Sequence, residues 1–332
     1  MSRARFLTPA LVLAAGLLVP PGAGAQDAVI ATSDRSGVIG SLVLEDPSRH
    51  RRVPLTVYYP VGQGRWPFPV IVFSHGAGGS KDGYAYLGRY WASHGYVVIH
   101  PTHFGSDASL LRRHRPFYNL RAIKKMVTTP RNFIDRPQDI SFVLDHLAQV
   151  EGMDPELDGL FDLKRVGVAG HSFGAYTTLA VAGAVVSLKG QKPRSFRDPR
   201  PLAFIALSPQ GDEPGVFEGN AWAGIRRPFL VMTGTEDKGL GGQPASWRQQ
   251  PYGGMPPTGN KDQIVITGAD HMNFAGVGLN GKVRDGAKNE YIQKATLTFW
   301  DAYLKGDLTA QRDVQSGYFP KVDGVEAAVQ EK

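Results

Sequence analysis

Cysteine is absent from all 332 residues of the sequence. Its absence excludes disulfide bonds, so an exported form of this chain depends on packing alone for its stability. It also excludes the lipid-modified cysteine of a lipobox. Long apolar runs are scarce as well, and the most pronounced one, residues 11–19, is too short to span a bilayer. The sequence therefore predicts neither crosslinks nor a membrane-spanning helix.

Residues 1–25 have the pattern of a cleavable signal peptide. Two arginines precede the apolar run at 11–19, and Ala-Gly-Ala at 23–25 matches an A-x-A cleavage site. An uncleaved membrane anchor is the alternative, and prolines on both sides of the run argue against it. We therefore expect a secreted or periplasmic protein whose residues 26–332 form a single domain.

Basic side chains exceed acidic ones, 37 against 30, which gives a formal net charge of +7. The predicted leader carries two arginines and no acid, so its removal leaves a modestly basic mature chain. Such a surface favours transient contact with anionic surfaces or membranes. No nucleic-acid-binding motif accompanies the charge, and we expect no nucleic-acid partner.

The sequence is organised around residues 166–175, where a short apolar run leads into Gly170-His171-Ser172-Phe173-Gly174. The run predicts a buried parallel strand, and the small residues after it predict a helix over 175–186. G-x-S-x-G between a strand and a helix is typical of a nucleophile elbow, a turn so tight that the positions two residues on either side of the serine need glycine or a residue nearly as small. We predict that Ser172 is a nucleophile with strained backbone dihedrals. A chance Gly-Ser-Gly turn is the alternative.

Apolar runs alternate with helical patterns along the chain, which predicts a mostly parallel sheet with helices on its faces. The predicted strands cover 40–45, 53–59, 70–73, 96–99, 166–169, 202–207, 229–232 and 263–266. We expect the first two to form an antiparallel edge hairpin. Helices are predicted over 82–94 and 287–304. A further helix is predicted to start at Pro137, with Ile140, Val143, Leu144 and Leu147 facing the sheet.

Residues 104–135 are the least regular part of the pattern and mix apolar with basic side chains. An insertion there, near the carboxyl ends of the strands, can serve as a lid, an anion-binding wall or a membrane-facing patch. A solvated loop that contains one helix is equally compatible with the sequence. Residues 308–332 are predicted to form a peripheral tail.

A glycine-rich turn, residues 74–79, follows the predicted strand 70–73. Exposed backbone N–H groups in such a turn bind a developing oxyanion with little reorganisation. A simple sharp turn also needs glycine, but the accompanying elbow favours an oxyanion hole. His100 and His103 follow the next strand. We interpret them as structural or substrate-facing, because no carboxylate or third histidine completes a metal-ligand set.

Three chemically complementary side chains, Ser172, Asp237 and His271, follow successive predicted strands in the order Ser, Asp, His. A serine hydroxyl is a weak nucleophile, so a histidine has to remove its proton and later protonate the leaving group. The acid orients the imidazole and stabilises the imidazolium. Asp212, after the preceding strand, is the alternative acid, whereas Asp270 is badly placed because it adjoins the base.

Four motifs resemble the platelet-activating-factor acetylhydrolase-like branch of the α/β-hydrolases, which includes bacterial proteins labelled predicted dienelactone hydrolases. They are FSHGAGG at 73–79, SHGYVV at 93–98, GHSFG at 170–174 and HMNF at 271–274. The resemblance covers 42–304 and implies the α/β-hydrolase fold, with an oxyanion hole from the backbone N–H groups of Ala77 and Phe173. The acetylhydrolase acid follows the strand at 202–207, which points to Asp212. The acid loop of the bacterial relatives resembles 235–237 instead.

These patterns predict a catalytic domain that cleaves carboxylic esters through an acyl-enzyme, with no metal or organic cofactor. The resemblance implies a short to medium acyl group on a small-molecule or lipid ester. Dienelactone hydrolases use a cysteine nucleophile, so their substrate does not transfer to this chain. A lipase or polyesterase, with 104–135 as an apolar platform, is a second reading. A non-catalytic binding protein on a hydrolase scaffold is a third, and the complete Ser-Asp-His set argues against it.

Overall fold

The computed structural model describes residues 35–63, 67–111, 116–276 and 283–332. The predicted signal peptide, residues 1–25, lies outside these ranges, as do residues 112–115 of the irregular segment. Within the described ranges, no helix combines the length and the apolar character that crossing a membrane requires.

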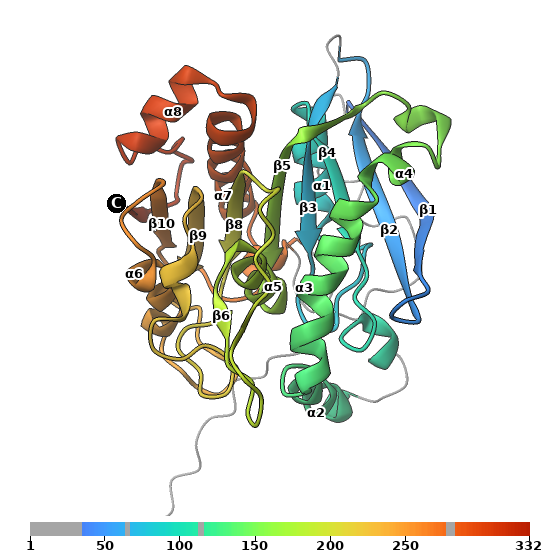
Figure 1. Cartoon of the computed structure of the whole chain (residues 1–332). Helices are drawn as coiled ribbons and strands as arrows, with labels where there is room; N and C mark the ends of the chain where they lie inside the picture. The colour runs from blue at the N-terminus through green and yellow to red at the C-terminus, as the bar shows by residue number, and fades with distance from the viewer. Residues whose placement is uncertain (1–34, 64–66, 112–115, 277–282) are drawn as a thin grey trace, which may run out of the picture.

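A nine-stranded sheet forms the centre of the molecule, in the order β1-β2-β4-β3-β5-β8-β9-β10-β11 (Figure 1). The strands are β1 (Ser36–Asp46), β2 (Arg51–Pro60), β3 (Phe68–Ser74), β4 (Val97–Pro101), β5 (Phe161–His171), β8 (Ala203–Leu207), β9 (Phe229–Gly234), β10 (Lys261–Ile266) and β11 (Ala327–Glu331). The six strands from β4 to β10 run parallel, and antiparallel strands flank them on both edges. The mostly parallel sheet and the edge hairpin β1–β2 are confirmed.

Helices cover both faces of the sheet, as the α/β-hydrolase fold requires (Figure 1). They are α1 (Ala85–Ser93), α2 (Pro116–Met126), α3 (Pro130–Asp145), α4 (Leu147–Glu151), α5 (Phe173–Ala182), α6 (Gln250–Gly254), α7 (Gly286–Trp300) and α8 (Leu308–Gln315). Successive side chains of β3 alternate between two hydrophobic clusters, because strand residues point to opposite faces. Val70 and Val72 pack with α3 and α5, whereas Ile71 and Phe73 pack with α1 and α7.

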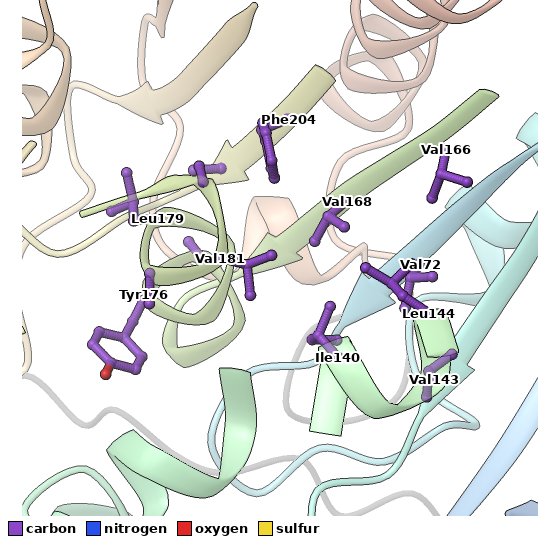
Figure 2. Close-up of a cluster of buried hydrophobic side chains, with 14 of the residues drawn as sticks. Val72, Ile140, Val143, Leu144, Val166, Val168, Tyr176, Leu179, Val181 and Phe204 are labelled. Carbon is purple, nitrogen blue, oxygen red and sulfur yellow. The ribbon is translucent and has the colours of Figure 1, made fainter. Parts of the chain in front are cut away.

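The apolar stripe of α3 lies against the sheet, as its spacing predicts. Figure 2 shows Ile140, Val143 and Leu144 beside Val72 and other valines of the central strands. All three side chains are at most 5% exposed. Their burial stabilises the fold by roughly 1.5–3 kcal/mol per side chain. Leu147, the fourth predicted position, is buried as well and begins α4.

The prediction that Pro137 starts a helix is wrong, because α3 begins at Pro130 and Pro137 lies inside it. An internal proline removes the N–H that would bond the carbonyl four residues earlier, here that of Phe133. The hydroxyl of Tyr176 on α5 donates to this carbonyl at 2.7 Å. A side chain from a neighbouring helix therefore replaces the missing backbone donor and lets the helix continue through the proline.

Other predicted boundaries shift by a few residues. The helix predicted over 82–94 begins only at Ala85, and the one predicted over 175–186 ends at Ala182. Gly183 then has φ 121°, a value that favours glycine, and the chain turns into β6 (Val185–Val186), which pairs with β7 (Arg194–Ser195).

The segment predicted as a peripheral tail, 308–332, contributes two elements at the edge of the sheet. It forms α8, and its last residues form β11, which pairs antiparallel with β10. Val314 and Phe319 are buried in the hydrophobic cluster under α7. The strand 263–266, expected to be the last one, is therefore followed by another.

The irregular segment contains the short 3₁₀ helix η1 (Ala108–Leu110) and α2 before it enters α3. Leu111, Ile123 and Met126 form a small third cluster, and Ala77 packs against it. The segment thus lies beside the turn that follows β3, near the carboxyl ends of the strands, where the insertion was predicted. The remaining short helices are η2 (Pro155–Leu157), η3 (Ala221–Gly224), η4 (Ala245–Gln249), η5 (Asn273–Ala275) and the π-helical η6 (Asp301–Lys305).

Candidate active site

Ser172 stands in a strained turn between β5 and α5. Its φ and ψ are 55° and −116°, a conformation that non-glycine residues rarely adopt. A Cβ atom on Gly170 would collide with the backbone of Gly174, and one on Gly174 would collide with the carbonyl of Ser74. Only glycine fits at these two positions, so the sequence pattern and the turn geometry agree. Ser172 itself remains partly exposed at the sheet edge.

The structure brings Ser172, His271 and Asp237 into one hydrogen-bonded line. The Oγ atom of Ser172 lies 2.9 Å from Nε2 of His271, and Nδ1 of that ring lies 3.0 Å from Oδ1 of Asp237. Asp237 is fully buried and also accepts a hydrogen bond from Thr233 at 2.9 Å. This arrangement leaves Nε2 free to take the serine proton and places a carboxylate behind the ring.

The two competing carboxylates lie elsewhere. Asp212 is exposed, and its backbone amide donates to the Gln250 side chain at 2.7 Å. Asp270 accepts hydrogen bonds from backbone N–H groups of its own turn and forms an ion pair with Arg284. Of the carboxylates considered from the sequence, Asp237 alone reaches the imidazole.

Arg248, from η4, lies beside Asp237 and is 3% exposed. Its Nε atom is 2.6 Å from the Asp237 carboxylate, and the guanidinium also donates to four backbone carbonyls. Burial opposes ionisation of Asp237, but the Arg248 charge and the hydrogen bond from His271 hold the pKa of this carboxyl well below its ordinary value. Arg248 and His271 therefore favour the ionised form of Asp237.

Two backbone N–H groups flank the serine. Phe173 is the first residue of α5, so its N–H has no acceptor within the helix and carries the positive end of the helix dipole. Ala77 lies in the turn after β3, and the next amide, that of Gly78, donates to the Ser106 carbonyl at 2.8 Å. Neither the Ala77 nor the Phe173 amide donates to an acceptor in the described parts of the chain. Both amides are thus unpaired there, which the predicted oxyanion hole requires.

A hydrogen-bonded relay connects the turn after β3 to the backbone of His271. The N–H of Gly76 donates to the Tyr84 hydroxyl at 3.1 Å, and this hydroxyl lies 2.8 Å from Nδ1 of His171. Nε2 of His171 lies 3.0 Å from the His271 carbonyl. A carbonyl only accepts, so Nε2 carries the proton and Nδ1 accepts from Tyr84. His171 therefore uses both ring nitrogens for Tyr84 and for the backbone of His271, and it holds the base from behind.

Sequence reasoning missed Ser208 and Arg248, which contact the line, and Tyr84, which contacts His171 behind it. Ser208 lies 2.6 Å from Nδ1 of His271 through its Oγ atom. Its place directly after a strand is a usable signal, but a serine there does not match the acid of a Ser-Asp-His set. Arg248 lies in a loop rich in glycine, proline and glutamine, and Tyr84 precedes a helix. Neither has a local sequence pattern that marks it.

The histidines considered as metal ligands are buried and hydrogen-bonded within the protein. His103 lies 3.0 Å from both Asp139 and Ser74, and His100 lies 3.0 Å from the Gly83 carbonyl. Burial lowers the pKa of each ring to about 4. His75 lies under the turn after β3, where its Nε2 accepts from the His103 amide at 3.1 Å. In the described ranges, no group of three ligating side chains is arranged to hold a metal ion.

Two comparisons with known proteins find similarity to one family. A family model described as platelet-activating factor acetylhydrolase, isoform II, matches residues 47–115. The curated platelet-activating factor acetylhydrolase of Cavia porcellus is 23% identical over 288 residues, which cover 76% of this chain and 61% of the relative. The chain thus spans about six-tenths of the length of that relative. The family match includes the turn that carries Ala77.

Proposed function

We propose that this chain, which belongs to the platelet-activating-factor acetylhydrolase-like α/β-hydrolases, is a serine hydrolase of carboxylic esters. The observation that carries the proposal is the continuous line from Ser172 through His271 to Asp237, with contacts of 2.9 and 3.0 Å. Nucleophile and base within hydrogen-bond reach, with the base oriented by a third group, is the geometry that activates a serine.

In the proposed reaction, Ser172 attacks the ester carbonyl carbon while its proton moves to Nε2 of His271. The tetrahedral oxyanion accepts hydrogen bonds from the Ala77 and Phe173 amides. The bond to the alcohol then breaks, and the alkoxide takes the proton from Nε2, which leaves an acyl-enzyme. Water attacks the acyl carbon with His271 as base, and the acid and free serine form. Asp237 stays ionised throughout and stabilises the imidazolium.

The proposed substrate is a small-molecule or lipid ester with a short to medium acyl group, on the strength of the family relationship. A lipase or polyesterase is the second candidate. It is favoured by Phe104 and Leu110, which are 40% and 41% exposed on the segment beside the site. A series of p-nitrophenyl esters of increasing chain length separates the two, because a lipase keeps its activity on long acyl chains.

We also propose that the protein is exported to the periplasm or the medium. The support is the leader pattern at 1–25 and the absence of cysteine. Amino-terminal sequencing of the mature protein from cell fractions tests this proposal. Cleavage after Ala25 is the expected result, and retention of the leader in the cytoplasm would contradict it.

The hydrolase proposal is tested by covalent labelling with a fluorophosphonate and by turnover of p-nitrophenyl butyrate. The native chain should be labelled, and Ser172→Ala should not be. Ser172→Ala and His271→Ala should each lower kcat by several powers of ten, and the double variant should be little worse, because the residues act as a unit. A folded Ser172→Ala variant with native turnover would refute the serine mechanism. A native chain that is neither labelled nor active would indicate a binding protein.

A further inference from the structure

We propose that Arg136, a buried arginine of α3, is a positioning residue for the two backbone amides of the proposed oxyanion hole. This role rests on the function proposed above, because it concerns how the amides of Ala77 and Phe173 are held in that mechanism. Arg136 acts through the turn after β3 and through the start of α5, the two segments that supply these amides.

The guanidinium of Arg136 is a buried charge without a carboxylate beside it. The residue is 0% exposed, and burial lowers its pKa to about 9, which leaves it charged at neutral pH. In the described ranges it contacts a backbone carbonyl, two hydroxyl groups and an imidazole, but no carboxylate. Two aspartates of the same helix, Asp135 and Asp139, pair with Arg51. A buried charge without an ionic partner is costly, so its presence here calls for a reason beyond packing.

The contacts of Arg136 join three separate segments of the chain. Its guanidinium donates to the His75 carbonyl in the turn after β3, and to the Ser106 hydroxyl at 3.1 Å in the irregular segment. On α5 it donates to the Thr177 hydroxyl at 3.3 Å, and it lies 4.6 Å from the centre of the Phe173 ring, within the range of a cation–π contact. One side chain therefore links the turn after β3 to the first residue of α5.

The peptide planes of the turn show what this link fixes. In a trans peptide, the carbonyl and the N–H that follows it point in opposite directions. Arg136 holds the His75 carbonyl on its own side, so the N–H of Gly76 points the other way. The next carbonyl, that of Gly76, lies 2.6 Å from Nδ1 of the His75 ring. The Ala77 N–H belongs to the same peptide as that carbonyl and therefore points away from the ring.

Loss of this link should act on the transition state rather than on substrate binding. Arg136→Met removes the charge and all the donors, so the Ala77 amide is no longer held in one direction. Because loss of one oxyanion donor lowers kcat by about 10²–10³-fold, we expect kcat on p-nitrophenyl butyrate to fall about 100-fold at unchanged KM. Arg136→Lys keeps the charge and a donor for the His75 carbonyl, and its kcat should fall about tenfold.

A trifluoromethyl ketone separates positioning from a general loss of structure. Its carbonyl carbon bonds to the Ser172 oxygen, the serine proton moves to His271, and the ketone oxygen becomes an anion at the place of the oxyanion. Its Ki should rise by the same factor as kcat falls, about 100-fold in Arg136→Met and about tenfold in Arg136→Lys. A fall in kcat without the matching rise in Ki would refute the role, and so would native kcat and Ki in a folded methionine variant.

Arg136→Met leaves the His75 carbonyl without a buried donor and can fail to fold. Thr177→Val keeps the guanidinium and removes one of its contacts, so kcat should fall about threefold at unchanged KM. Thr178→Val is the matched control and should keep native kcat. Thr178 is as buried as Thr177 and also donates to the carbonyl four residues earlier on α5, but in the described ranges it has no hydrogen bond to Arg136. Equal kcat in the two valine variants would refute the role of Arg136.

The role of Arg136 and the proposed function fail in different ways. If the tests above refute the role while a fluorophosphonate still labels the native chain at Ser172, the function stands. If the native chain is inactive, amide hydrogen exchange of the turn decides the role. The Gly76 and Gly78 amides, both hydrogen-bonded in the structure, should then exchange at least threefold faster in Thr177→Val than in Thr178→Val. Equal exchange in the two variants would show that Arg136 does not hold the turn.

Discussion

At the scale of single residues, the site depends on how two strand ends meet one imidazole. Asp237 and Ser208 both reach Nδ1 of His271, and Arg248 holds the two loops together. Asp212 was a reasonable alternative from the sequence, because it follows the same strand as Ser208. The chain turns away at Pro209, and the Asp212 amide donates to Gln250 at 2.7 Å on the protein surface.

The two carboxylates should therefore differ sharply when each is replaced by its amide. Asp237→Asn removes the partner of the imidazolium and should lower kcat on the order of 10⁴-fold. It also leaves Arg248 buried without a counter-charge, which typically costs about 3–5 kcal/mol of stability. Asp212→Asn should change kcat and the stability of the fold only slightly. Steady-state kinetics measure the loss of kcat in each variant, and circular dichroism checks that each variant is folded. A larger loss in Asp212→Asn than in Asp237→Asn would transfer the acid role to Asp212.

The hydroxyl of Tyr84 belongs to the same scale, because it joins the turn after β3 to His171. Tyr84→Phe removes the acceptor of the Gly76 N–H and the donor to Nδ1. A buried donor left without a partner costs about 1–3 kcal/mol. We expect a lower melting temperature and a reduced kcat at little-changed KM. Tyr90→Phe is the control, since Tyr90 lies on α1, the helix that Tyr84 precedes, and its hydroxyl makes no hydrogen bond in the described ranges. Equal kcat in both variants would contradict the relay.

At the scale of helices and strands, the sequence predicts those elements that a local residue pattern encodes. Each central strand is an apolar run, and the elbow is visible because tight backbone contact demands glycine at two fixed positions. Pro137 misled the prediction of α3, because the donor that allows the helix to continue comes from Tyr176, 39 positions away. The strand β11 was missed because its alternation is weak and only the exposed edge of β10 makes it a strand.

The proline and the tyrosine should be energetically coupled. Tyr176→Phe leaves the buried Phe133 carbonyl without a donor and should lower the free energy of unfolding by about 1–3 kcal/mol. In a Pro137→Ala background the backbone N–H returns to this carbonyl, so removal of the hydroxyl should cost much less. Urea unfolding of the four proteins in a double-mutant cycle measures the difference. Additive effects of the two substitutions would show that the hydroxyl does not replace the backbone donor.

At the scale of the whole molecule, buried imidazoles make the fold sensitive to acid. His75, His100, His103 and His171 are all at most 3% exposed. Burial lowers the pKa of each one, and His100 and His103 reach about 4. The unfolded chain takes up protons near pH 6.5, whereas the folded chain stays neutral at these rings. Stability is therefore fully present above about pH 6.5 and is lost as the pH falls toward 4.

His100 offers the clearest test of this dependence, because its ring has a single hydrogen bond, to the Gly83 carbonyl. A pKa that falls from 6.5 to about 4 contributes about 2 kcal/mol of stability at pH 7 that is absent at pH 5. His100→Asn keeps an amide donor at the position of Nδ1 but does not titrate. Urea unfolding at both pH values should show a loss on acidification about 2 kcal/mol smaller in this variant than in the native chain. The exposed His50→Asn is the control, and its loss should equal the native one. If His100→Asn and the native chain lose the same free energy between the two pH values, the acid sensitivity arises from other groups.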